Sequence, residues 1–391
     1  MKELSILILS AIATLNLAAG QSPPDQYHSA GTMDMVLIDN PGNPPDPVFN
    51  YKGGQVNYEF LISKYEITNA QYVAFLNAVG KEDKNQIYKD GKTSAESVGH
   101  ITTGANGEKI TTTRVKPLII RSGERGAYSH EVKPGYEDVP VWNVSWFDAA
   151  RYVNWLHNGQ PSGAQTILTT EDGAYPLRDR SEGVDIPRRP QAKYWLPSAD
   201  EWHKAAYHDP SLPPENQYNK FATGSDQEPK KAEARQLLVT NPGPNTLAFS
   251  GLAWPVPVGA CGNKSAYGVC DMMGNVDEWT DQTILDKHRG IRGGGVRSGN
   301  ITKDQGGVGS DPAKAGWMVG IRVASKSSDK EQASRGDGKI TSDAQPLTNP
   351  SGTQRDQAPA DRIRQIKSLL DHGQIQQDEY DRRVKEILDS I

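Results

Sequence analysis

Two cysteines are the residues of this chain best suited to redox or metal chemistry, and they stand nine positions apart, at Cys261 and Cys270. In an oxidising compartment this spacing lets two thiols close a small disulfide loop. Two free thiols are the alternative. A metal pair is less favoured, because no histidine or third thiol lies close by in the sequence. The sequence therefore predicts a disulfide between Cys261 and Cys270.

The elements that must position reactive groups are short and widely separated. Helix-start signals occur at Thr68, Ser145 and Ser198, each followed three residues later by Gln, Asp or Glu and then by an apolar stripe. Strand candidates cover 58–65, 290–292 and 318–324. Strands and helices do not alternate regularly, and 38 glycines with 26 prolines indicate long loops. These patterns predict an α+β fold with little regular secondary structure.

The two ends of the chain differ from its middle. Residues 1–20 have a basic start, an apolar run and a small-residue end, which predicts a secretory signal peptide; an uncleaved membrane anchor is the alternative. The mature protein is then expected to be periplasmic or extracellular, with no transmembrane segment after cleavage. A net charge of −5 over 391 residues gives no reason to expect a nucleic-acid partner.

The C-terminal part is predicted to contain a linker and a helical hairpin. Residues 326–358 are polar and rich in Ser, Asp, Gln, Gly and Pro, which predicts a disordered linker. Within 359–391, two apolar stripes at helical spacing flank a break at Asp371-His372-Gly373. This hairpin is too small to bury its stripes alone, so self-association through 361–391 or docking is expected.

Six motifs in the middle of the chain carry a resemblance to a known family. In order, they occupy 64–72, 140–146, 195–202, 274–279, 292–294 and 320–324. Together they resemble the formylglycine-generating enzyme (sulfatase-modifying factor) family, over a domain placed at 31–325. The resemblance implies a C-type-lectin-like variant of an α+β fold. The C-terminal hairpin separately resembles the short C-terminal (SHOCT) domain of many bacterial proteins.

The copper chemistry implied by this family is predicted to be lost. In catalytic members, two cysteines after an Arg-Gly-Gly-Ser turn bind copper(I), for which soft thiolates are suited. Here Gly295 occupies the position of the family's serine and Ser298 that of its first cysteine. No cysteine follows Cys270, and the Cys261–Cys270 pair precedes the 274–279 motif, whereas the family's copper site follows it. We therefore expect no catalytic residues and no copper.

A structural calcium ion is the cofactor that the resemblance implies. Glu278 offers a carboxylate, while Gly274, Asn275 and Val276 can present backbone carbonyls, and calcium prefers several hard oxygen ligands. Alternatively, Glu278 pairs with an arginine. The tryptophans of the motifs are predicted to be core residues rather than a sugar-stacking platform.

Two functions remain open at this point. The first is a non-catalytic binding or scaffold module, whose protein or glycan ligand is set by variable loops such as 80–133. The second is an exported oxidoreductase of the family that uses an unrecognised site. Because one fold serves many functions, the site residues decide, and the missing thiols favour the first.

Overall fold

Three helices begin directly after the residues predicted to cap them. They are α1 (Asn69–Val79), α2 (Trp146–His157) and α3 (Ala199–Tyr207). Each cap side chain accepts a hydrogen bond from the third helical amide, and the third side chain accepts one from the amide of the cap residue. These reciprocal bonds satisfy amides that a helix start leaves unpaired. The three predicted helix starts are confirmed.

The computed structural model describes residues 33–47, 53–90, 92–103, 109–231, 246–247, 255–295, 308–316 and 318–327, with scattered positions between 363 and 387. The predicted signal peptide, Ser298, the linker beyond Ser327 and most of the predicted C-terminal hairpin lie outside them. No helix among the residues described has both the length and the apolar character needed to cross a membrane.

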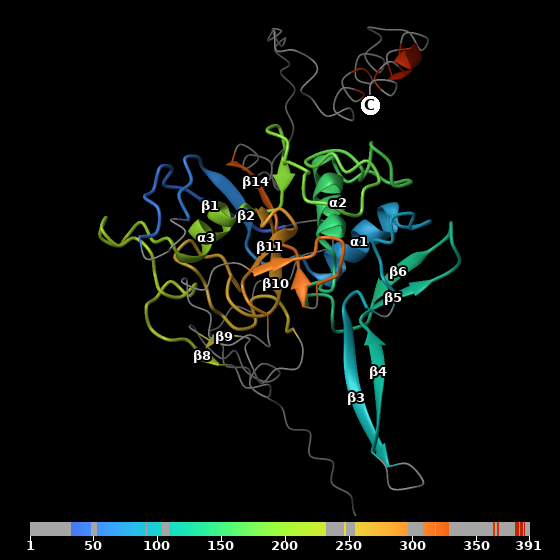
Figure 1. The fold of residues 1–391 in the computed structure, drawn as a ribbon, viewed down its shortest axis with the longest axis horizontal. Helices are drawn as coiled ribbons and strands as arrows, with labels where there is room; N and C mark the ends of the chain where they lie inside the picture. Colours follow the sequence, from blue (N-terminus) through green and yellow to red (C-terminus); the bar gives the residue numbers. More distant parts are fainter. Residues whose placement is uncertain are drawn as a thin grey trace, which may run out of the picture.

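Two four-stranded sheets organise the body of the protein (Figure 1). The first has the order β1-β2-β14-β7, and β2 pairs antiparallel with both of its neighbours. The second has the order β12-β11-β10-β13, in which β10 and β13 run parallel. Their strands are β1 (Met35–Ile38), β2 (Phe60–Ser63), β7 (Tyr194–Trp195), β10 (Asp277–Ile284), β11 (His288–Arg292), β12 (Val308–Ser310), β13 (Val319–Gly320) and β14 (Ala324–Lys326). The mixed content and the short elements confirm the predicted α+β class with little regular structure.

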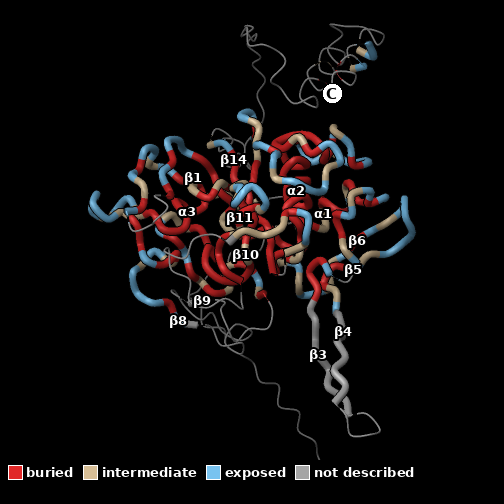
Figure 2. Tube along the Cα trace, viewed as in Figure 1, coloured by how far each residue is buried: buried red, intermediate tan, exposed pale blue. Residues whose placement is uncertain are grey.

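The core lies between the helices and these sheets, where Figure 2 shows the buried residues concentrated. Aromatic side chains join α1 to α2: Tyr72 and Phe75 pack on Tyr152 and Trp155 with ring centroids 5.4–6.0 Å apart. Large rings bury much apolar area and prefer tilted or edge-on contacts. The predicted core tryptophans are all buried: Trp142, Trp146, Trp195, Trp202 and Trp279.

The predicted variable segment contains a structure that the sequence prediction missed. Strands β3 (Ala95–Thr103) and β4 (Lys109–Pro117) pair antiparallel and extend away from the body (Figure 1). The signal was present: β-branched runs flank an Asn-Gly pair at 106–107, a common hairpin turn. Two further small sheets pair β5 (Ile119–Ser122) with β6 (Ser129–Val132), and β8 (Lys230–Lys231) with β9 (Thr246–Leu247).

Candidate functional site

The turn after β11 is the place where the resemblance expects catalysis. Gly293 and Gly294 both have positive φ, at 104° and 73°, which favours glycine. The Gly294 amide donates to Asp277 Oδ1 at 2.9 Å, so a carboxylate from the start of β10 closes the turn. At Gly295, an added Cβ would lie 3.5 Å from Asp277 Oδ2, which is ordinary contact. The described part of the turn therefore presents backbone groups and one carboxylate.

Behind this turn, Arg322 is fully buried and binds Glu278. Its Nη2 lies 2.7 Å from Glu278 Oε1, and its Nε donates to both carboxylate oxygens at 2.9 Å. The other oxygen of Glu278 also accepts from Trp202 Nε1 at 2.6 Å. Arg322 further donates to the carbonyls of Ser63 and Cys270. Glu278 therefore forms an ion pair with an arginine in this structure. The sequence analysis gave this pairing as the alternative to calcium binding.

Two more carboxylates share the same buried region. Glu66 is 1% exposed, and neither of its oxygens accepts a hydrogen bond from the residues that the structure describes; its Oε2 lies 3.9 Å from Arg322 Nη2. Burial, and then the charge of Asp271, raise the pKa of Glu66 well above its usual value. Burial likewise raises the pKa of Asp271 to about 6. One arginine therefore faces three buried carboxyl groups, so this region is electrostatically costly unless some of them are protonated or neutralised.

This network also explains why the motifs occur together. Glu66, Trp202, Glu278 and Arg322 come from four of the six motifs and meet at one place. The 140–146 motif is connected to this cluster through Val144, whose carbonyl accepts a hydrogen bond from Trp279 Nε1 at 3.0 Å. These motif residues thus form one buried framework that joins distant parts of the chain.

The family comparison agrees with this framework. The sequence model of the sulfatase-modifying factor enzyme 1-like domain matches residues 52–327. The chain belongs to this family. The crystal structure of CarF is 21% identical and has a TM-score of 0.45, covering 75% of this chain and 98% of CarF. Treponema denticola variable protein 1 is 16% identical with a TM-score of 0.43, covering 78% of this chain and all of that protein. No curated protein matches the chain significantly.

The two cysteines for which the sequence predicts a disulfide are not bridged in this structure of the sulfatase-modifying factor domain. Cys261 and Cys270 are both free thiols and both buried. Burial raises the pKa of the Cys270 thiol to about 12, and it raises the pKa of Cys261 as well. The Cys270 carbonyl is fixed by Arg322, and its Sγ lies 3.9 Å from the Gly268 carbonyl. The bridge indicated by their spacing stays a prediction for protein in an oxidising compartment.

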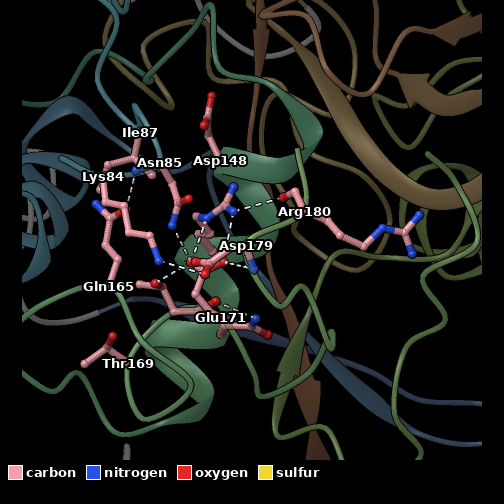
Figure 3. Close-up of polar contacts among 12 residues, drawn as sticks. Lys84, Asn85, Ile87, Asp148, Gln165, Thr169, Glu171, Asp179 and Arg180 are labelled. Atoms are coloured by element: carbon pink, nitrogen blue, oxygen red, sulfur yellow. Dashed lines mark hydrogen bonds and ion pairs between the residues drawn. The ribbon is translucent and has the colours of Figure 1, made fainter. Parts of the chain in front are cut away.

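A further buried network, which the sequence prediction missed, joins three segments around Glu171 (Figure 3). Arg151, on α2, donates Nε and Nη2 to the two Glu171 oxygens at 2.8 and 2.9 Å. Asn85 Nδ2 and the Thr170 hydroxyl donate to Oε1, and the Asp179 amide donates to Oε2. Because both carboxylate oxygens accept hydrogen bonds, Glu171 links the loop that contains Asn85 and the loop that contains Asp179 to α2. An arginine between Ala150 and Tyr152 in this aromatic-rich helix was the signal that could have indicated it.

The charge state of Asp277 is expected to make the stability of the fold depend on pH. Burial raises its pKa from 3.8 to about 6, although the amides of Gly295 and Gly294 act in the opposite direction. The folded state thus holds this proton more tightly than the unfolded state, so Asp277 costs stability as the pH rises through about 6. Asp277→Asn, which keeps an acceptor for Gly294, is expected to match the wild type in urea unfolding at pH 4 and to be more stable at pH 8. A stability difference that does not vary with pH would contradict this account.

Proposed function

We propose that this chain is an exported, non-catalytic binding or scaffold protein of the sulfatase-modifying factor family. The observation that carries the proposal is the turn after β11. Gly295 replaces the family's serine there, Asp277 binds the turn through the Gly294 amide, and the sequence has no cysteine beyond Cys270. Copper(I) oxidase chemistry needs thiolates at this turn, and a serine hydroxyl at position 298 is a poor substitute.

We do not expect the two existing cysteines to supply a relocated copper pair, since they precede the 274–279 motif and the family's copper site follows it. Copper(I) binds thiolates, and thiolates form readily where a positive group or exposure lowers the thiol pKa. Cys261 and Cys270 show the opposite shift, because burial raises both pKa values. The proposal is tested by offering the protein copper(I) and a sulfatase-type Cys-x-Pro-x-Arg peptide, from which no aldehyde is expected.

Calcium near 274–278 is proposed as a structural ion and not as part of a reaction. Arg322 and Trp202 both bind the Glu278 carboxylate, so in this position it is poorly suited to coordinate calcium. The backbone carbonyl oxygens of Gly274, Asn275 and Val276 are the remaining candidate ligands. An ion that binds only the folded state raises the melting temperature by mass action. We expect a lower melting temperature in chelator than in calcium, with magnesium as the control. Superimposable melting curves would exclude the ion.

Export and assembly complete the proposal. The signal at 1–20 would deliver the domain to the periplasm or the medium, and the apolar stripes of 361–391 would allow copies to associate. Among the described C-terminal positions, Ile363 and Ile387 are buried, which supports an apolar contact in this part of the chain. A binding protein with this layout would present its ligand site on the sulfatase-modifying factor domain, outside the cytoplasm.

A further inference from the structure

A pocket of about 550 Å³ opens where β7, the end of β14 and the chain before β2 meet. Its volume is within the usual range for small-ligand sites. Six of its lining side chains could recognise a ligand: Tyr58, Glu59, Arg188, Arg189, Trp195 and Lys326. None of the lining residues comes from the turn after β11, so this pocket is separate from the expected catalytic position.

A buried carboxylate holds three of these side chains in place. Glu201, which is fully buried, accepts from the Tyr58 hydroxyl at 2.6 Å, from Trp195 Nε1 at 3.0 Å and from Arg188 Nη1 at 3.1 Å. Glu201 is itself fixed by the capping box of α3. In preorganised binding sites, the side chains that line the pocket are often held in place by buried residues outside the pocket.

Two of the three cations that line the pocket are paired with carboxylates, and Lys326 supplies the charge that no described carboxylate neutralises. Arg188 uses Nη1 for Glu201 and places Nε 3.5 Å from Asp281, which leaves its Nη2 without a partner in the described part of the chain. Lys326 is exposed and pairs with no carboxylate of the described residues. Arg189 adds a third cation, which is paired with Asp172 on one side. A guanidinium edge and an ammonium group that line the same pocket suit a carboxylate.

The same pocket offers a flat apolar face. Tyr58 is 46% exposed, although its hydroxyl is tied to Glu201 and its ring packs edge-on against Phe60, with centroids 6.2 Å apart. A fixed, exposed ring of this kind favours stacking or edge-on contact with another planar ring. Glu59, the one carboxylate that lines the pocket, can accept a hydrogen bond from an amide N–H.

We propose that this pocket binds a carboxylate carried next to a planar ring, as in the carboxyl-terminal aromatic residue of a peptide or in a free aromatic acid. The cations would bind the carboxylate, and Tyr58 would stack on the ring. Where the ligand has an amide, Glu59 would accept a hydrogen bond from its N–H. This inference rests on the proposed binding role, whose ligand it names by chemistry.

The test uses matched probes on the full chain by isothermal titration calorimetry or ligand-observed NMR. N-acetyl-phenylalanine is expected to bind with a Kd of roughly 0.1–1 mM. N-acetyl-phenylalaninamide lacks the charge, and N-acetyl-alanine lacks the ring; both are expected to bind at least about tenfold more weakly. A pentapeptide ending in phenylalanine separates the two sources: retained binding indicates a peptide terminus, and loss indicates a free acid.

Variants locate the site. Lys326→Gln is expected to weaken N-acetyl-phenylalanine about threefold, since an exposed charge contributes modestly, whereas Lys287→Gln, an exposed lysine in the β10–β11 turn, is expected to leave binding unchanged. Tyr58→Phe keeps the ring and is expected to retain most binding, while Tyr58→Leu is expected to lose it; melting curves check that both variants fold.

The proposal is overturned if the amide binds as tightly as the acid. It is also overturned if Lys326→Gln and Lys287→Gln behave alike, or if no probe binds at about 10 mM. These outcomes are independent of aldehyde formation, which tests the proposed function instead. A protein that made aldehyde could still bind N-acetyl-phenylalanine here.

Discussion

Arg322→Gln is expected to lower the free energy of unfolding by about 3–5 kcal/mol, because it leaves Glu278 buried without its cation. The loss extends beyond that pair. Arg322 also lowers the pKa of Glu66 and of Asp271, so without it both carboxyl groups would be harder to ionise beside Glu278. Urea unfolding followed by tryptophan fluorescence measures the change.

Two controls make the Arg322 result specific. Arg180→Gln removes an exposed arginine that pairs with exposed Asp185, and it is expected to change stability by less than about 1 kcal/mol. Arg322→Lys keeps the charge but loses the planar fork that reaches Glu278, Ser63 and Cys270, so its cost should be intermediate. If Arg322→Gln and Arg180→Gln cost the same, the buried network does not stabilise the fold.

The second large effect is expected at Glu171. Glu171→Ala removes five hydrogen bonds and leaves Arg151, which is 1% exposed, without a counter-charge, so we expect a loss of about 3–5 kcal/mol. Backbone hydrogen exchange should also become faster in the loop that contains Asn85 and in the loop that contains Asp179. Each of these two residues donates a hydrogen bond to the Glu171 carboxylate (Figure 3).

A nearby exposed pair is the matched control for Glu171. Lys84→Gln breaks the contact between Lys84 and Asp179, whose side chains are about half exposed, and should cost less than about 1 kcal/mol. The double variant Arg151→Met with Glu171→Leu should recover part of the loss, since an apolar pair can replace a buried ion pair. Additive costs in the double variant would show that the two residues do not act as a unit.

The sequence was sufficient for those parts of the fold that depend on local signals. The capping residues Thr68, Ser145 and Ser198 predicted all three helix starts, because a cap bond joins residues three positions apart. The β3–β4 hairpin has a comparable local signal in the Asn-Gly pair at 106–107, between strands that pair antiparallel.

The polar networks were harder to predict because their partners are distant in sequence. Glu278 and Arg322 are 44 positions apart and Tyr58 and Glu201 are 143 apart, so no spacing rule connects them. The motifs indicated Glu278, Trp202 and Arg322 individually, but only the fold shows that they form one cluster. The cysteines illustrate the same limit: their spacing permits a bridge but does not fix the distance between the thiols, which are free in this structure.

The most direct measurement of the central claim is aldehyde formation. Purified protein would be loaded with copper(I) and incubated with a Cys-x-Pro-x-Arg peptide in air, beside a catalytic family member that has both turn cysteines. Mass spectrometry of the peptide should show conversion by the catalytic member and none above the protein-free blank for this chain, because Gly295 and Ser298 stand where the chemistry needs serine and a thiolate. Copper-dependent turnover by this chain would contradict the account.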